Sequence, residues 1–177
     1  QKWLERGADS RLLIVRPGVV YGPKDPGNIG RMVAAIQKGY FAFPGSMNIF
    51  KSYGYVYGLM DSISFTMTAP DRLIVYNYVE TPTETLGTIA RHVQSFSGST
   101  SPIFSLPTAL LMPAAHVVQA IAGSKNPVHP VRVKKASMPT HIVPQKLIDM
   151  GFTFKYSFLS SLAHWQSVSP EDFPNKR

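Results

Sequence analysis

Few side chains in this chain have the type and spacing that chemistry requires. The sequence contains no cysteine, which excludes disulfides, thiolate metal sites and a cysteine nucleophile. Its five histidines show neither an H-x-x-x-H nor an H-E-x-x-H spacing, so we expect structural or exposed histidines and no metal site. Asp61 and Glu84 are single carboxylates at expected helix starts. Capping and the helix dipole explain both better than acid–base catalysis does.

A loop rich in proline and glycine is the segment best placed to bind a ligand. It follows Arg11–Val15, a continuous apolar and β-branched run that indicates a strand buried on both faces, as in parallel sheets. The loop itself, residues 16–23, reads Arg-Pro-Gly-Val-Val-Tyr-Gly-Pro. Open α/β sheets bind ligands at the carboxyl ends of their strands. The sequence therefore predicts a ligand-binding loop here.

The elements that position this loop alternate between strands and helices. Strands are predicted at residues 11–15, 41–43, 50–57, 72–78 and 103–106. Helices are predicted at residues 29–38, 59–69, 82–96, 107–122, 144–150 and 156–166. Thr81, Pro82 and Glu84 have the N-cap, N1 and N3 spacing of a capping box, which would start a helix at Pro82. The alternation is typical of the α/β class.

Several motifs follow one another in an order that indicates a known family. Arg16–Pro23 is similar to an RPxxVYGP segment, and Lys51–Val56 to the stretch R-d-f-v-y-V. Tyr76-Asn77, Thr81–Ala90 and Met150–Trp165 match later motifs of the same family. With these motifs the chain resembles the extended short-chain dehydrogenases, the NAD-dependent epimerase/dehydratase family, over nearly its whole length.

The resemblance implies the C-terminal portion of a Rossmann-type extended short-chain dehydrogenase. The last sheet strands would be joined by a small α/β substrate-binding domain. Residues 1–28 and about 70–80 would be the remnant of the NAD(P)-binding Rossmann domain. Residues from about 29–69 and 81–177 would form the interleaved substrate-binding domain.

The family's catalytic elements are not found in this sequence. Its chemistry needs a Gly-rich strand-to-helix turn and a Tyr followed four residues later by a Lys, with the Tyr acting as general acid and base. Gly27 and Gly30 give only G-x-x-G, and Tyr21 has Lys24 at a spacing of three. The chain also begins without Met, at Gln1. We therefore expect the turn and the Tyr/Lys pair to lie upstream, no catalytic residue in this chain, and no turnover by it alone.

The resemblance also implies a cofactor-binding segment. Pro17, Gly18 and Val19 would line the nicotinamide side of the cleft and offer backbone groups to the carboxamide of NAD or NADP. The loop also has the structural role of ending a buried strand, and this role is compatible with cofactor binding. Many family members carry Asn at the position of Val19, and Val cannot donate the corresponding hydrogen bond to a substrate.

Four residues are implied as substrate contacts: Val19, Arg31, Phe43 and Lys51. Lys51 stands where the family often has an Arg that pairs with the diphosphate, and Lys can act there as a point charge without the bidentate fork. A solvated surface position is the alternative for Lys51 and for Arg31. A place in the core is the alternative for Phe43.

We interpret the chain as the substrate-binding half of an NAD(P)-dependent nucleotide-sugar epimerase or dehydratase, so that the whole protein would be an enzyme. Val19 and the aromatic run Tyr53, Tyr55 and Tyr57 leave open a reductase of a hydrophobic carbonyl substrate. A non-catalytic dinucleotide-sensing or scaffold protein on the same fold is a third interpretation. The intact or eroded state of the upstream motifs would separate the enzyme from the sensor.

Composition limits the other partners. The net charge is +8, but the basic residues are spread along the chain and only Arg132, Lys134 and Lys135 cluster, so we expect no nucleic-acid partner. The apolar stretches are too short for a membrane span, so no membrane partner is expected. We expect a cytoplasmic protein, and a homodimer is compatible with the family.

Overall fold

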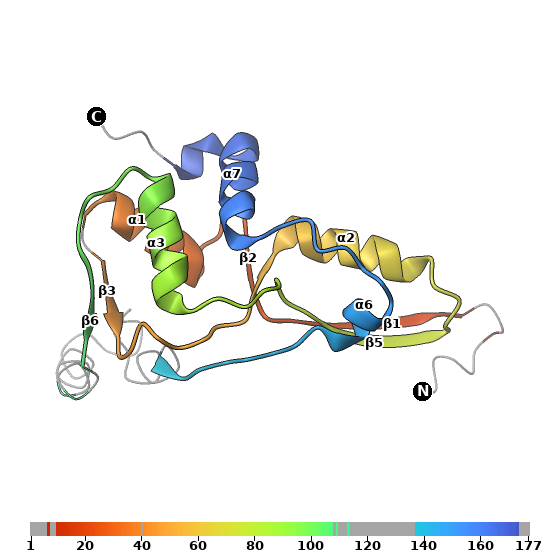
Figure 1. Ribbon diagram of the computed structural model, residues 1–177. Helices are drawn as coiled ribbons and strands as arrows, with labels where there is room; N and C mark the ends of the chain where they lie inside the picture. The colour runs from red at the N-terminus through yellow and green to blue at the C-terminus, as the bar shows by residue number, and fades with distance from the viewer. Residues whose placement is uncertain are drawn as a thin grey trace.

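The computed structural model describes residues 10–39, 41–107 and 137–173, together with residues 7, 109 and 113 (Figure 1). Its strands are β1 (Leu12–Pro17), β2 (Val19–Tyr21), β3 (Phe41–Pro44), β4 (Tyr53–Tyr55), β5 (Leu73–Tyr78) and β6 (Ile103–Leu106). Its helices are α1 (Asn28–Gln37), α2 (Val56–Met67), α3 (Leu86–Phe96), α6 (Gln145–Asp149) and α7 (Phe158–Val168), followed by the short 3-10 helix η2 (Pro170–Asp172). This alternation confirms the predicted α/β class. The predicted helix 107–122 lies outside the described residues.

The strands form three parallel pairs. β1 pairs with β5, β2 with β4, and β3 with β6. The first pair runs in register from Leu12 opposite Leu73 to Pro17 opposite Tyr78. Figure 1 shows this pair at one end of the molecule and the β3–β6 pair at the other. Because β1 and β5 are parallel and end together, the segments that follow them emerge at the same edge.

The largest hydrophobic core lies between α1, α3 and α7. Helix α1 contributes Ile29, Met32, Val33 and Ile36, all at most 3% exposed and spaced to fall on one helical face. Gly39 follows with a φ of +83°, a left-handed conformation that ends the helix at little cost for glycine. A second, smaller core joins β5 to α6 through Ile74, Tyr76, Tyr78 and Leu147.

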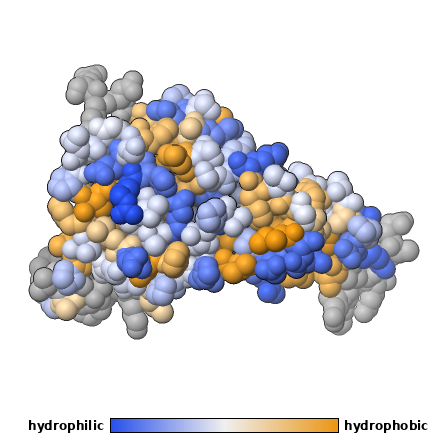
Figure 2. Space-filling view, viewed as in Figure 1, coloured by the Kyte–Doolittle hydropathy of each residue, from blue (hydrophilic) through white to orange (hydrophobic). Residues whose placement is uncertain are grey.

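The β1–β5 pair differs from the expected strand buried on both faces. Ile14, Leu73 and Val75 are 36–43% exposed. Helices α2 and α6 pack on the pair, but they cover the side of the alternate residues, such as Leu13 and Ile74. Figure 2 shows apolar surface at this end of the molecule, next to hydrophilic residues. Within the described residues, the pair is therefore covered on one side.

The division of the chain into two interleaved domains stays a prediction. Helices α2 and α6 fall in the segments 29–69 and 81–177, which we assigned to the substrate-binding domain. Both nevertheless pack against β1 or β5. Parts of those segments therefore accompany the Rossmann-type strands. No helix of the described residues is long and apolar enough to cross a membrane.

The capping box predicted at Thr81 is wrong. Helix α3 begins at Leu86, its N-cap is Thr85, and the Thr85 side chain accepts a hydrogen bond from the Thr88 N–H. Residues 81–84 are not helical, and the residues that follow them pair with another segment. Thr85 bridges Phe50, and the Leu86 N–H donates to the Ile49 carbonyl oxygen over 3.0 Å. These long-range contacts override the local helix signal.

A carboxylate near the end of the described chain joins α7 to the loop after β2. Asp172 Oδ2 accepts hydrogen bonds of 2.7 Å from the Lys24 backbone N–H and from Trp165 Nε1. Partial burial raises the pKa of Asp172, but these hydrogen bonds outweigh it and leave the pKa below its usual value. A depressed pKa gives stability that is present above the unfolded-state value of 3.8 and is lost as the pH falls through the folded-state value.

We therefore expect Asp172→Asn to lower the free energy of unfolding by about 1 kcal/mol at pH 7, because a charge-assisted hydrogen bond becomes a neutral one. The difference from the unmodified protein should shrink as the pH falls below about 4. Urea unfolding at a series of pH values measures it. Asp149→Asn, at an exposed carboxylate with one side-chain partner, is the control and should change little. An Asp172 effect that is the same at pH 7 and pH 3.5 would contradict this account.

Candidate functional site

Three chain segments meet at the carboxyl ends of β1 and β5. The Gly18 N–H donates to the Tyr78 carbonyl oxygen over 2.9 Å, which continues the pairing one residue past β1. The Val19 N–H donates to the Ser52 carbonyl oxygen over 2.9 Å. The Glu80 N–H donates to the Tyr53 carbonyl oxygen over 2.8 Å. The loop after β1, the approach to β4 and the exit of β5 are thus fixed to one another where an α/β sheet binds ligands.

The structure brings Pro17, Gly18 and Val19 to this edge, as the sequence indicates. Pro17 and Val19 are exposed, and Val19 retains 40% of its accessible surface. Gly18 is enclosed, because a Cβ on it would lie 2.4 Å from the Ser52 carbonyl oxygen. The loop therefore presents apolar side chains on a tightly held backbone. The cofactor role of these residues stays a prediction.

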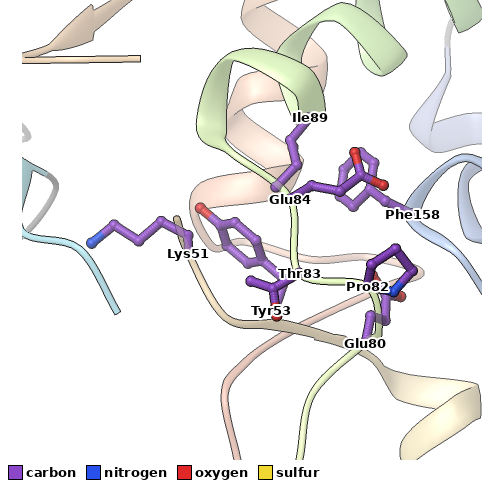
Figure 3. A pocket seen from close by; sticks show the side chains of 8 residues that line it. All are labelled: Lys51, Tyr53, Glu80, Pro82, Thr83, Glu84, Ile89 and Phe158. Atoms are coloured by element: carbon purple, nitrogen blue, oxygen red, sulfur yellow. The ribbon is translucent and has the colours of Figure 1, made fainter. Parts of the chain in front are cut away.

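A shallow pocket lies beside this edge. Its lining residues are Lys51, Tyr53, Glu80, Pro82, Thr83, Glu84, Ile89 and Phe158 (Figure 3). The pocket is open to solvent and much smaller than typical ligand pockets.

Lys51 is the predicted substrate contact that lines the pocket. Its side chain is half-buried, burial lowers its pKa, and its Nζ donates to the Met138 carbonyl oxygen. In Figure 3 the ammonium extends away from Glu80 and Glu84 toward the segment that contains Met138. Lys51 therefore places its positive charge at the rim of the pocket rather than at its centre.

The other predicted substrate contacts lie elsewhere. Phe43 is 5% exposed, belongs to the large core and packs edge-on against Phe41 with ring centres 4.7 Å apart. Arg31 is exposed on α1, and its Nη2 donates to Asn28 Oδ1 over 2.8 Å. Neither belongs to the pocket lining. Their contact with a substrate stays a prediction. The buried position of Phe43 matches the alternative that this side chain belongs to the core.

Glu80 is a site residue that the sequence interpretation missed. It is 7% exposed at the floor of the pocket, and the Tyr21 hydroxyl lies 2.6 Å from its Oε1. Burial raises the pKa of Glu80 to about 8, against hydrogen bonds from Tyr21 and the Tyr55 backbone that lower it. The available signal was a single carboxylate directly after a buried strand, at the carboxyl end of β5.

The remaining charged groups near the pocket form one pair. Glu84 Oε2 lies 2.8 Å from His92 Nε2, and both side chains are partly exposed. Within residues 10–39, 41–107 and 137–173, no three His, Asp or Glu side chains cluster closely enough to hold a metal ion. The pocket therefore offers carboxyl and hydroxyl groups in its lining and a single cation, Lys51, at its rim.

Comparison with known proteins gives one curated relative. The chain is 28% identical over 167 residues to N-acetyl-alpha-D-glucosaminyl-diphospho-ditrans,octacis-undecaprenol 4-epimerase of Escherichia coli O157:H7. That match covers 92% of this chain and 50% of the relative. No protein family model matches the chain.

Solved structures show a similar fold. The human epimerase family protein SDR39U1 (isoform 2) with NADPH superimposes with a TM-score of 0.66 at 21% identity, over 91% of this chain and 50% of that one. UDP-N-acetylglucosamine 4-epimerase from Bacillus cereus gives a TM-score of 0.65 at 11% identity, over 93% of this chain and 49% of that one. The chain thus spans about half the length of the proteins it matches.

Proposed function

Because this chain matches the C-terminal part of an extended short-chain dehydrogenase/reductase, we propose that it is the substrate-binding half of an NAD(P)-dependent epimerase or dehydratase. Its substrate would be a sugar linked to a diphosphate, with a nucleotide sugar as the first candidate. The likeness to the E. coli epimerase along 92% of the chain carries this proposal. The names of both epimerases contain a sugar joined to a diphosphate.

The described residues suit the roles that this function requires. A bound nicotinamide dinucleotide would take up and return a hydride. Pro17 and Val19 would pack against its ring, while Gly18 would hold the loop in place through its close contact with Ser52. Lys51 would offer a single positive charge to a diphosphate at the pocket rim. The Tyr/Lys pair and the Gly-rich turn would come from residues upstream of this sequence.

The exposed side of the β1–β5 pair supports the proposal that the Gly-rich turn and the Tyr/Lys pair belong to a further part of the protein. Parallel strands are usually buried on both faces and seldom occur as isolated pairs. Ile14, Leu73 and Val75 present an apolar strip that suits further strands and helices of a Rossmann-type domain. We therefore expect this chain to show no NAD(P)H-dependent turnover by itself, and measurable turnover by the purified chain would contradict that expectation.

The function can be tested by isothermal titration calorimetry on the protein that includes the upstream half. UDP-N-acetylglucosamine should bind in the presence of NAD or NADP, and Lys51→Ala should weaken that binding about 5- to 10-fold, because it removes one charge contact to phosphate. Lys38→Ala, at the exposed end of α1, should leave the affinity unchanged.

Two results of this titration would overturn parts of the proposal. If no nucleotide sugar and no polyprenyl-diphosphate sugar binds, the diphosphate-sugar proposal is wrong. A hydrophobic carbonyl substrate is then favoured. Binding of a polyprenyl-diphosphate sugar without any nucleotide sugar would exclude the nucleotide part alone. Dinucleotide binding without any turnover would favour a sensor.

A further inference from the structure

Glu80 lies in an unusual place for a carboxylate. It is 7% exposed, lines the pocket and sits between β2, β4 and the end of β5. Among the described residues, no Lys, Arg or His forms an ion pair with it. A buried carboxylate without a cation is expensive, and such groups commonly retain their proton instead.

A chain of short oxygen–oxygen contacts leads from Glu80 to helix α7. Glu80 Oε1 lies 2.6 Å from the Tyr21 hydroxyl oxygen, which lies 2.5 Å from Ser161 Oγ. Ser161 Oγ in turn lies 2.6 Å from the Phe158 carbonyl oxygen in the first turn of α7. All three side chains are buried, at 7% exposure or less, so water cannot readily satisfy any of these oxygens.

The number of available hydrogens decides the protonation state. The chain has three contacts, and Tyr21 and Ser161 supply one hydroxyl hydrogen each. An ionised Glu80 would leave two hydrogens for three contacts, so one pair of oxygens would face each other at about hydrogen-bond distance without a hydrogen. A protonated Glu80 supplies the third. Glu80 then donates to Tyr21, Tyr21 to Ser161, and Ser161 to the Phe158 carbonyl oxygen.

We propose that Glu80 is held as a neutral carboxylic acid that starts this one-way hydrogen-bond chain, and that it acts as a positioning residue for the loop Pro17–Tyr21 against α7. Tyr21 ends β2, three residues beyond Gly18, so fixing Tyr21 fixes the segment between them. The protonation of Glu80 stands on the geometry alone. Its consequence for ligand binding rests on the proposed function.

The charged and titratable groups around Glu80 favour the neutral form. They are Tyr21 on β2, Lys51 before β4, Tyr53 and Tyr55 on β4, Tyr78 on β5, Glu84 before α3 and His92 on α3. Glu84 raises the pKa of Glu80 further, after the larger effect of burial. Lys51 directs its ammonium toward Met138. Helix α7 contributes Ser161, which carries no charge.

A neutral Glu80 also suits an anionic ligand. The carboxyl group lines the same pocket as Lys51, the residue proposed to meet a diphosphate. An ionised Glu80 would repel that diphosphate, whereas the acid does not. Binding of UDP-N-acetylglucosamine should therefore weaken as the pH rises past the pKa of Glu80.

The first test is a carboxyl ¹³C NMR titration of the protein and of Glu80→Gln. We expect one glutamate signal that titrates well above pH 7 and is missing from the variant. Glu84→Gln is the matched control, because it removes the neighbouring carboxyl and should keep that signal. A Glu80 signal that titrates near the ordinary value of 4.5 would overturn the proposal. Should Glu80→Gln fail to fold, a glutamate signal that titrates well above pH 7 and persists in Glu84→Gln still supports the proposal, and the absence of any such signal overturns it.

The second test is the pH dependence of the melting temperature. A pKa raised from 4.5 to about 8 gives stability that is fully present below pH 4.5 and is lost as the pH rises through about 8. Gln keeps a neutral donor, so the Tm of Glu80→Gln relative to the unmodified protein should rise by about 10 °C between pH 5.5 and 8.5. Glu84→Gln should show no such rise. A Glu80→Gln variant destabilised equally at every pH would count against the neutral acid.

These outcomes separate the two proposals. Loss of UDP-N-acetylglucosamine binding from pH 7 to pH 9 in the unmodified protein, but not in Glu80→Gln, supports the positioning role in ligand binding. Equal loss in both proteins refutes it. No binding at any pH, together with a high-pH Glu80 titration, defeats the proposed function and leaves the hydrogen-bond chain intact.

Discussion

Gly18→Ala should lower the free energy of unfolding by about 3 kcal/mol and the melting temperature by about 9 °C. A methyl group on Gly18 would lie 2.4 Å from the Ser52 carbonyl oxygen and 2.8 Å from Val79 Cγ1. The first of these neighbours is backbone, so it cannot move aside as a flexible side chain could. Relief requires the strand end to shift, which stretches the hydrogen bonds that Gly18 makes to Tyr78 and Val19 makes to Ser52.

The matched control for this variant is Gly98→Ala. Gly98 has a φ of +60° with nothing within 4 Å of an added methyl group, so its cost is backbone strain alone, about 1 kcal/mol. Thermal and urea unfolding of the two variants compare the stability lost to a steric clash at Gly18 with the stability lost to backbone strain at Gly98. In the protein that includes the upstream half, Gly18→Ala should also weaken NAD or NADP binding, while Gly98→Ala should not. Equal stability losses in the two variants would refute the steric account.

Local sequence patterns predicted the elements that depend on one helix or one strand. Helices α1 and α6 fall within one or two residues of their predicted bounds, because an apolar face and a following glycine are both local signals. Helix α7 begins two residues later than predicted, at a capping box formed by Ser157 and Ser160 that the sequence interpretation did not include. Strand β2 is only three residues long and depends on β4, so no periodicity could reveal it.

Long-range contacts account for the element that was misplaced. The Leu86 and Gly87 N–H groups donate to the carbonyl oxygens of Ile49 and Met47, nearly forty residues earlier in the chain. Those bonds fix the start of α3 at Leu86, whatever the helix signals of residues 81–84. A capping-box spacing indicates only that a helix could begin at that point in the isolated segment. It contains no information about a partner strand elsewhere.

The site shows the same division. The place of Pro17, Gly18 and Val19 at the carboxyl ends of the strands could be predicted, because the loop follows a recognisable strand and its motif is contiguous. Glu80 could not be singled out, since a carboxylate after a strand usually faces solvent. Its burial results from Tyr21 and Ser161, which are 59 residues before it and 81 residues after it. Perturbed carboxylates of this kind depend on tertiary packing and are therefore found by structure.

Trp165→Ala should have the largest effect on stability, about 4 kcal/mol, with a fall in the melting temperature of about 12 °C. Trp165 is 1% exposed in the large core. Its ring centre lies 5.2 Å from that of Phe173 and 6.2 Å from that of Tyr21. Truncation leaves a cavity among three helices that cannot close, and it also removes the Nε1 hydrogen bond to Asp172.

Two further variants separate packing from the hydrogen bond at Trp165. Leu159→Ala shortens an apolar side chain on the same helix that is 46% exposed, so it should cost less than about 1 kcal/mol. Trp165→Phe keeps most of the ring but loses the hydrogen bond to Asp172. Because Asp172→Asn weakens the same bond from its other end, the two effects should not add in urea unfolding. Full additivity would show that the Trp165–Asp172 hydrogen bond contributes nothing measurable to stability.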